Sequence, residues 1–352
     1  MISVGVKRFI VHHFFLEDIL NDASFEMVRY ENQNDPKFWT YLNSQVYKFD
    51  NAGLPTNQSS GNRQIKNIVK PGIDDFGFIL GVELALCFHG IYLKSDNIEY
   101  QNQPGTCVMV FLPGTFLFNQ GENEILEWMD AFEQRIPQSH VCREFIKVIV
   151  LHSQVPPIDQ QQAFEEADHG TLKIVLCTNI AESSITIADA SFVLDYGLRR
   201  SMEYNLVRKI QQLTLGWISR ASATQRLGRC GRCQPGVCVA LYTRKFLSTF
   251  RDHDIPEIAQ ISLEGLVLRV KDIFPEEGVR ELLNQLVEPP ESSQLNDAFA
   301  NLRLSGAISG QDEDGQVTFF GRLAGPMPCD LIQSRVMLFA CSFGYPSEGS
   351  FY

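Results

Sequence analysis

KIVLCTNIAESSIT at residues 173–186 and QRLGRCGR at residues 225–232 are the two segments that decide the fold. The first begins as an apolar run of β-forming residues and stops at Thr178 and Asn179. Short polar side chains at the carboxyl end of a buried strand mark the place where open α/β sheets bind ligands. The residues that follow, 181–185, suit a first helical turn whose free N–H groups can hold a phosphate. An ordinary turn capped by Thr178 and Asn179 is the alternative that this segment leaves open.

The second segment carries polar residues that share one helix face if residues 222–232 are helical. Gln225, Arg229 and Arg232 then lie at i, i+4 and i+7, and Arg226 flanks that face. The two glycines of the segment would each cost about 1 kcal/mol relative to alanine in a plain helix. Close approach of a ligand or a second domain explains the glycines better than a solvated basic face does. Guanidinium groups are suited to the oxygens of a transferring phosphoryl group.

The charge around these segments points in the same direction. Residues 199–232 hold eight Lys or Arg residues and one Glu, inside a chain whose formal net charge is −12. A basic segment in an acidic chain indicates a polyanionic partner.

The two segments resemble motifs V and VI of the DEAH/RHA group of superfamily 2 RNA helicases. Residues 225–232 fit the pattern QRxGRxGR, and residues 178–186 fit TNIAE[ST]SxT. The resemblance implies an α/β fold with a RecA-like parallel sheet covered by helices on both faces, followed by an α-helical winged-helix domain. It also implies an ATP-dependent RNA helicase, which is a nucleotide hydrolase, with single-stranded RNA as partner.

Carried over by position, the resemblance implies that Gln225, Arg229 and Arg232 are catalytic residues at the γ-phosphate of ATP. The same three residues would bind the nucleotide together with Thr186 and Asp189, which would lie near the ribose. Asp189 stands one place later than the usual acidic position of the family, which puts a hydrogen bond to the ribose in question.

RNA contacts are implied for Thr178, Asn179, Ser153 and Arg200. Ser153 follows a strand predicted at residues 145–151, so it is expected at the same sheet edge as Thr178. Arg200 lies in a hairpin predicted over residues 199–215, which separates nucleic-acid strands in the family. From the local sequence alone, an ordinary surface hairpin is an equal alternative.

Two motifs of a complete motor are absent from the sequence. It contains no Gly-Lys-Ser or Gly-Lys-Thr and no Asp-Glu-x-His, which would cradle the phosphates and hold Mg²⁺. We therefore expect this chain to supply the arginine side of a composite ATP site. The Mg²⁺ ligands are expected on a first RecA-like domain of the same full-length protein, and the chain alone is expected to be inactive as an ATPase.

The alternation of predicted strands and helices divides the chain into four parts. Residues 1–105 hold an opening strand and a variable insert with two helices, one around residues 82–89. Residues 106–250 form the second RecA-like domain, with helices at 122–135 and 159–167. Residues 255–328 form the winged helix, with helices at 256–274, 278–286 and 292–304 and a hairpin ending at residue 322. Residues 329–352 begin a further helical domain that cannot be complete.

Composition sets the remaining expectations. The 352 residues are 44% hydrophobic with no run of eighteen apolar residues, so no membrane association is expected. Nine cysteines without a regular framework fit a reducing compartment, and we expect a cytoplasmic protein, with the nucleus as an alternative. No metal site is predicted, because Cys230 is better explained as a small buried residue than as part of a zinc or redox site with Cys233.

A narrower resemblance concerns residues 307–322. They are similar to the Tudor-domain-containing, spindle-E type branch of the group, which acts with PIWI-interacting RNAs to silence transposons in the germline. This similarity implies PIWI-type protein partners and location in germ granules. A general DEAH helicase of splicing or translation, and a non-catalytic RNA-binding scaffold, are the alternatives.

Overall fold

The computed structural model describes eleven stretches of the chain. They are residues 9–52, 69–94, 106–114, 124–136, 145–153, 155–168, 170–183, 185–205, 210–310, 315–327 and 329–343. The chain divides into two compact units, and each is described by itself. Unit 1 comprises Met1–Ser201 and Leu215–Asp254, and unit 2 comprises Met202–Thr214 and Ile255–Tyr352.

Unit 1 is built on a six-stranded sheet in which every neighbouring pair is parallel, in the order β1-β8-β5-β2-β4-β3. The strands are β1 (Val11–Phe15), β2 (Thr106–Phe111), β3 (Ile146–Leu151), β4 (Leu172–Cys177), β5 (Ala190–Asp195) and β8 (Gly236–Ala240). All residues of β2, β4 and β5 are buried. Central strands of a parallel sheet have both faces covered, which is why these strands read as unbroken apolar runs.

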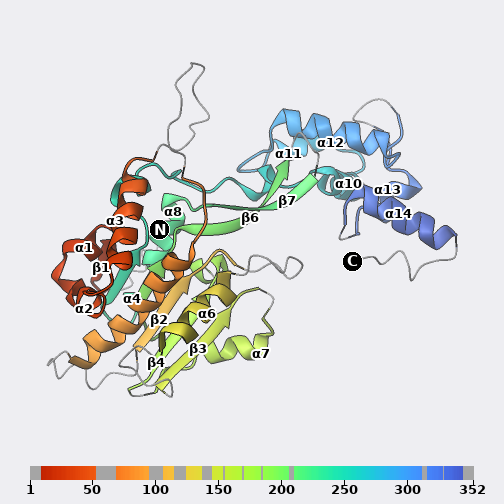
Figure 1. The fold of residues 1–352 in the computed structure, drawn as a ribbon. Coiled ribbons are helices and arrows are strands. Elements are labelled where there is room, and N and C mark those ends of the chain that lie inside the picture. The colour runs from red at the N-terminus through yellow and green to blue at the C-terminus, as the bar shows by residue number, and fades with distance from the viewer. Residues whose placement is uncertain are drawn as a thin grey trace, which may run out of the picture. The chain divides into compact units, whose positions relative to one another are not determined.

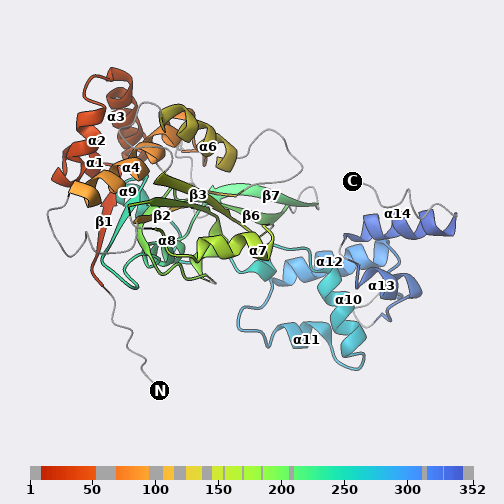
Figure 2. The same ribbon diagram turned by 90° about the horizontal axis from the view of Figure 1, so that it is seen from below.

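Alternate residues of β2 pack into two separate hydrophobic cores. Val108 and Val110 belong to the core under the larger helices, and Met109 and Phe111 belong to the core on the opposite face. Figures 1 and 2 show α3, α4 and α6 on the first face and α7 on the other. These helices are α3 (Pro36–Asp50), α4 (Asp75–Lys94), α6 (Glu124–Arg135) and α7 (Pro157–Gln160). The predicted sheet with helices on both faces is thus confirmed.

The described residues before β2, 9–52 and 69–94, add a helical layer to this sheet. β1 pairs with β8 at one sheet edge, and the chain continues through α1 (Asp18–Asn21), η1 (Ala23–Phe25) and α2 (Glu26–Glu31) into α3 and α4. The helix predicted around residues 82–89 lies within the longer α4. Most of the polar stretch predicted as part of the insert, residues 53–68, lies outside the described residues.

The helix predicted over residues 159–167 is wrong. The chain forms only α7 and one 3₁₀ turn, η4 (Gln161–Ala163). Lys173, buried in β4, donates from Nζ to the carbonyl oxygens of Ala163 at 3.2 Å and Glu165 at 2.6 Å. A continuing helix would use these carbonyls for its own hydrogen bonds, so the buried ammonium group ends it.

The hairpin predicted over residues 199–215 is confirmed as β6 (Leu198–Asn205) and β7 (Ile210–Trp217). Unit 2 contains η6 (Glu257–Ala259), α10 (Glu264–Ile273), α11 (Val279–Leu283), α12 (Ser292–Leu304), α13 (Phe319–Ala324) and α14 (Leu331–Ser342). The predicted second hairpin is reduced to one antiparallel bridge between Ile308 and Val317, because the Thr318 hydroxyl accepts from Gly321 N and starts α13. The winged-helix assignment stays a prediction. Among the helices of the described stretches, none is both long and apolar enough to cross a membrane.

Gly81 in α4 gives a test of the packing between helix and sheet. A Cβ at Gly81 would overlap the hydroxyl of buried Tyr196 and lie 3.3 Å from Trp128 Nε1. The Tyr196 hydroxyl cannot easily withdraw, because it donates to the Gly77 carbonyl at 3.0 Å. Gly81→Ala gains about 1 kcal/mol of helix propensity, but overpacking costs about 1–3 kcal/mol. We therefore expect a lower free energy of unfolding in chemical denaturation.

Gly265→Ala in α10 is the matched control, because its added Cβ has no atom within 4 Å apart from its chain neighbours and the backbone of its own helix. It should leave the free energy of unfolding unchanged or raise it by up to about 1 kcal/mol. Equal stabilisation by both substitutions would contradict the packing of α4 against Tyr196.

Candidate functional site

Three polar residues of the predicted site lie where parallel strands end. Thr178 follows β4, and its N–H donates to the carbonyl of Leu151, the last residue of β3, at 3.3 Å. Ser153 follows β3 and is exposed, as is Asn179. Gly114, beyond β2, has a φ of +98°, and a Cβ there would lie 3.2 Å from Thr178 Cγ2. The turn after β2 therefore approaches the end of β4 closely, and the three polar residues share one sheet edge.

The segment after Thr178 differs from its prediction. Residues 181–185 do not form the first turn of an α-helix, because the chain makes only one 3₁₀ turn, η5 (Asn179–Glu182). Glu182 is buried, and its carboxylate binds an arginine of the protein itself. The helical turn expected at residues 181–185 is therefore replaced by a shorter 3₁₀ turn that begins two residues earlier.

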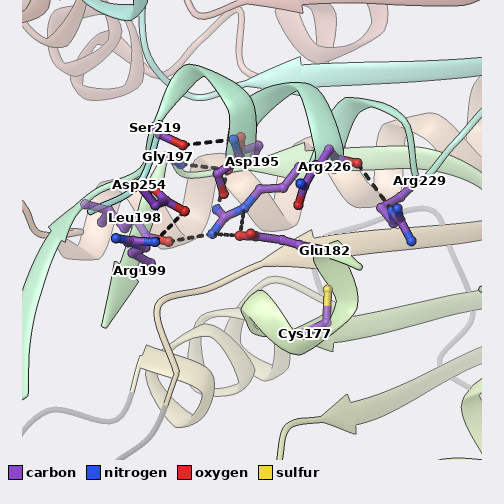
Figure 3. Close-up of polar contacts among 12 residues, drawn as sticks. Cys177, Glu182, Asp195, Gly197, Leu198, Arg199, Ser219, Arg226, Arg229 and Asp254 are labelled. Carbon is purple, nitrogen blue, oxygen red and sulfur yellow. Dashed lines mark hydrogen bonds and ion pairs between the residues drawn. The ribbon is translucent and has the colours of Figure 1, made fainter. Parts of the chain in front are cut away.

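That arginine is Arg226, which lies in α8 (Arg220–Leu227) and is fully buried. Figure 3 shows its side chain between Glu182 of η5 and Asp195 at the end of β5. Its Nε and Nη2 lie 2.8 Å and 2.7 Å from Glu182 Oε1, and its Nη1 lies 2.7 Å from Asp195 Oδ1. Nη2 also donates to the Leu198 carbonyl at 3.0 Å, and the guanidinium carbon lies 4.9 Å from the centre of the Phe111 ring.

The electrostatics of this cluster keep Arg226 charged. Burial alone would lower the pKa of Arg226, but the charges of Asp195 and Glu182 outweigh burial and raise it. Asp195 is held in turn by the Gly197 N–H at 2.8 Å and the Tyr242 hydroxyl at 3.2 Å. A buried guanidinium group with two carboxylate partners has a structural role in unit 1.

α8 ends at Leu227, so residues 222–227 are helical, whereas residues 228–232 do not continue the helix that the i, i+4, i+7 face would require. Gly228 caps α8, and Gly231 has a φ of +76°. A Cβ at Gly231 would overlap the Val11 side chain of β1, which explains why the chain turns on glycine there. The turn returns the chain toward residues 185–186.

The turn nevertheless brings the two predicted finger arginines together. Arg229 donates from Nη1 to the Ile185 carbonyl at 3.0 Å and from Nε to the Gln225 carbonyl at 3.3 Å. Arg232 donates from Nη1 to the Thr186 hydroxyl and from Nε to the Gly228 carbonyl at 3.3 Å. Thr186 and Gln225 are exposed beside them.

The charge environment of Arg229 and Arg232 differs from that of the other arginines nearby. Within the described part of residues 199–232, the remaining arginines each have a carboxylate partner, and they are Arg199, Arg200, Arg220 and Arg226. No carboxylate of the described residues forms an ion pair with Arg229 or Arg232. Partial burial and then the positive charge of Arg232 lower the pKa of Arg229. Two neighbouring guanidinium groups without a counter-charge form a site for an anion.

Three predicted site residues are buried or largely buried, and one of them is Thr178, which is 7% exposed. Asp189 is 4% exposed, and its Oδ1 lies 2.8 Å from Lys173 Nζ while Oδ2 accepts from Ala167 N at 3.0 Å. Its carboxylate holds the loop before β4 and is not available to a ribose. Arg200 is largely buried, with Nη2 2.5 Å from Glu124 Oε1, so the predicted RNA contact is not supported.

The sequence reasoning missed the Arg226 cluster. The motif pattern places Arg226 only beside the functional face, and it predicts no role for Glu182 or Asp195. One feature of the sequence indicates that Arg226 is buried, because Arg226 lies one helical turn after the small residues Ser222 and Ala223. The structure shows both of these residues to be buried. The small residues marked a buried helix face, and an arginine on such a face requires internal partners.

The cysteines near the site show no metal-binding arrangement. Cys230 is buried, as predicted, whereas Cys233 is exposed. In the part of the chain that the structure describes, no group of three or more His, Cys, Asp or Glu side chains could hold a metal ion.

Removing the Arg226 side chain should destabilise unit 1 strongly. Arg226→Ala leaves Glu182 and Asp195 buried without their cation, which costs about 3–5 kcal/mol. Arg226→Lys should not recover this loss, because an ammonium group cannot reach both carboxylates in the geometry of the guanidinium fork. Urea denaturation of each variant measures the change in the free energy of unfolding.

Arg220→Ala on the same helix is the control, because its side chain is 47% exposed and pairs with Asp252 at the surface. Its cost should stay within about 1 kcal/mol. Equal costs for Arg220→Ala and Arg226→Ala would contradict the buried cluster.

Cys230 and Cys233 should differ in reactivity despite their proximity in sequence. Burial raises the pKa of Cys230 to about 12, so its thiol stays protonated and inaccessible at pH 8. Iodoacetamide should therefore label Cys233 in the native chain and Cys230 only after denaturation, as peptide mass spectrometry can determine. Rapid native labelling of Cys230 would contradict the packing of the residues that follow α8.

Comparison with known proteins agrees with this geometry. The family model described as the helicase conserved C-terminal domain matches residues 93–234. The chain is 34% identical over 236 residues to the DExH-box ATP-dependent RNA helicase DExH6 of Arabidopsis thaliana, a match covering 66% of this chain and 17% of that protein. It is 36% identical over 258 residues to the human protein named probable ATP-dependent RNA helicase DHX34, covering 71% of this chain and 20% of the relative. The chain thus spans about a fifth of the length of these relatives.

The fold also matches the crystal structure of the Escherichia coli DExH-box NTPase HrpB. The TM-score is 0.61 at 20% identity, and the match covers 97% of this chain and 32% of that chain. This likeness confirms the RecA-like fold. The family model and the relatives thus make this chain similar to the C-terminal helicase domain of DExH-box RNA helicases, and the HrpB structure shows the same fold.

Proposed function

We propose that this chain is the C-terminal half of an ATP-dependent RNA helicase motor, in which Arg229 and Arg232 contact the γ-phosphate of ATP. The observation that carries the proposal is the pair of guanidinium groups beside residues 185–186. They are held by carbonyl and hydroxyl acceptors and have no carboxylate partner among the described residues. A triphosphate would supply the counter-charge that the described protein groups do not provide.

The hydrogen bonds of the two arginines suit them for this role. Each guanidinium group uses Nε and one terminal nitrogen for contacts within the protein. These contacts fix the plane of the group and leave its second terminal nitrogen for a ligand oxygen. Arginines that are already oriented stabilise the charge of a transferring phosphoryl group without reorganising during the reaction. Gln225, exposed one turn before Arg229, faces the same γ-phosphate in this proposal.

The sheet edge at Thr178 is the proposed RNA grip. Asn179 and Ser153 present exposed short polar groups just beyond the ends of β4 and β3, and Thr178 lies beside them with its side chain largely buried. Hydroxyl, amide and backbone N–H groups of this kind contact nucleic-acid phosphates without reading sequence. Thr186, bonded to Arg232, is proposed to lie near the ribose of the nucleotide.

The second half of the ATP site would come from a first RecA-like domain. That domain would provide the phosphate-binding loop and the Mg²⁺ ligands, and Mg²⁺ would neutralise charge on the β- and γ-phosphates. ATP would draw the two domains together and hydrolysis would release them, so that alternating grips move single-stranded RNA.

The choice of branch within the group has weaker support. The Tudor-containing branch, PIWI-type partners and a location in germ granules depend on sequence resemblance alone, and the cytoplasmic location depends on the cysteine pattern. Part of that resemblance, residues 311–314, lies outside the described residues. The proposal is therefore made for the DEAH/RHA group as a whole, and a general helicase of splicing or translation satisfies it equally.

The proposal predicts separate effects for the two groups of residues. In a protein that joins this chain to a first RecA-like domain carrying a Gly-Lys-Thr loop, Arg229→Ala and Arg232→Ala should each lower RNA-stimulated ATP turnover by about 10³-fold. Their affinity for single-stranded RNA should stay near that of the parent protein. Ser153→Ala with Thr178→Ala should weaken RNA binding instead, and turnover should recover at saturating RNA.

Lys245→Ala on α9 (Arg244–Leu247) is the control, because it removes an exposed positive charge away from both groups. The 352-residue chain without the added domain is the blank and should show no turnover. Full turnover in the Arg229→Ala protein would overturn the proposal. Salt-dependent RNA binding with no nucleotide effect in any variant would favour the non-catalytic scaffold.

A further inference from the structure

The chain passes between unit 1 and unit 2 at three places, which follow Ser201, Thr214 and Asp254. An ion pair within unit 1 joins two of them. Arg199 Nη1 lies 2.6 Å from Asp254 Oδ2, and Figure 3 shows the two side chains meeting beside the Arg226 cluster. Arg199 stands two residues before the first crossing, and Asp254 is the last residue before the third. The pair therefore links the first and the third crossing, which we call the two exits from unit 1, and holds them against each other.

The segment before the third crossing also caps α8. The first four N–H groups of a helix have no intrahelical acceptor. In α8 the N–H of Arg220 donates to the Arg251 carbonyl at 2.8 Å, and the N–H of Ala221 donates to the Asp252 carbonyl at 3.0 Å. The Arg220 side chain adds an ion pair to Asp252 at 2.8 Å. The N-terminus of α8 is thus attached to residues 251–252.

The rest of α8 connects to the other exit and to the proposed nucleotide site. Arg226 donates to the carbonyl of Leu198, the residue before Arg199. At the C-terminal end, Gln225 accepts from Arg229. A helix of eight residues is about 12 Å long, so α8 joins the anion-binding arginines to both exits over a short and stiff path.

We propose that Arg199 and Asp254 are positioning residues. Their ion pair makes the two exits and α8 move together as one rigid unit. A displacement of α8 on nucleotide binding would then be passed along the chain into unit 2 and the β6-β7 hairpin. We call the Arg199–Asp254 ion pair with the two exits the clasp. The effect of nucleotide in this inference rests on the proposed function, whereas the clasp rests on the contacts alone. Without the Arg199–Asp254 ion pair, the chain before the first crossing and the chain before the third crossing can move independently. A movement of α8 then no longer moves both exits together.

Coupling between ATP turnover and RNA strand separation tests the proposal. In the joined protein described above, Arg199→Ala and Asp254→Ala should leave RNA-stimulated ATP turnover within about twofold, while base pairs opened per ATP fall by about tenfold. The charge exchange Arg199→Asp with Asp254→Arg should recover the coupling ratio. A role limited to stability would lower turnover and unwinding together, and that result would overturn the proposal.

Arg244→Ala is the matched control. Arg244 forms an ion pair of the same kind in unit 1, with Asp18 at 2.6 Å, but touches neither exit. Its coupling ratio should equal that of the parent protein. An equal loss of coupling in Arg244→Ala and Arg199→Ala would show that the exits have no special role.

A second measurement tests the clasp in the 352-residue chain without using ATP. Nitroxide labels on Cys233 in unit 1 and Cys341 in unit 2, both exposed, report the distance distribution between the units by pulsed electron paramagnetic resonance. Cys142 and Cys329 are replaced by serine in this background. Arg199→Ala should broaden the distribution, and the charge exchange should narrow it again. An unchanged width would overturn the clasp, whereas a broadened width in a protein without Arg229-dependent ATP turnover would support the clasp and refute the proposed function.

Discussion

The architecture of unit 1 depends on the burial of one positive charge. Arg226 lies over Phe111, at the end of the central strand β2, and binds one carboxylate from each side of that strand. Glu182 lies beyond β4 and Asp195 ends β5. None of these three groups could be buried alone without a cost of several kcal/mol, so each requires the others. The cluster therefore fixes η5, β5, the start of β6 and α8 relative to the sheet.

This constraint separates two kinds of arginine within one eight-residue motif. Arg226 is saturated by Glu182, Asp195 and the Leu198 carbonyl, and it holds α8 in place. Arg229 and Arg232 follow α8, where a turn through Gly228 and Gly231 places them against residues 185–186. They receive orientation from neutral oxygens, and no carboxylate of the described residues forms an ion pair with either of them. Arg226 thus fixes α8 in place, and Arg229 and Arg232 remain able to bind an anion.

The sequence predicted the parts of the fold that depend on local pattern. Apolar runs predicted the central strands. The motif resemblance assigned Thr186, Arg229 and Arg232 to one nucleotide site, and in the structure Arg229 donates to the Ile185 carbonyl and Arg232 to the Thr186 hydroxyl. The predictions that were wrong involve long-range partners. Asp189 was expected at a ribose, but it pairs with Lys173, sixteen residues earlier and equally buried. The turn after α8 depends on the close approach of Val11 in β1, which no local pattern in residues 225–232 reveals.

Affinity for a transition-state analogue tests the central claim most directly, because it reports contact with the transferring phosphoryl group without turnover. In the protein joined to a first RecA-like domain, the dissociation constants for ADP with Mg²⁺ and for ADP with Mg²⁺ and aluminium fluoride would be measured for the parent and for Arg229→Ala. If Arg229 faces the γ-phosphate, the substitution should weaken analogue binding by about 10²-fold or more and leave ADP binding nearly unchanged. Equal weakening of both ligands, or of neither, would contradict the assignment of this arginine pair to the γ-phosphate.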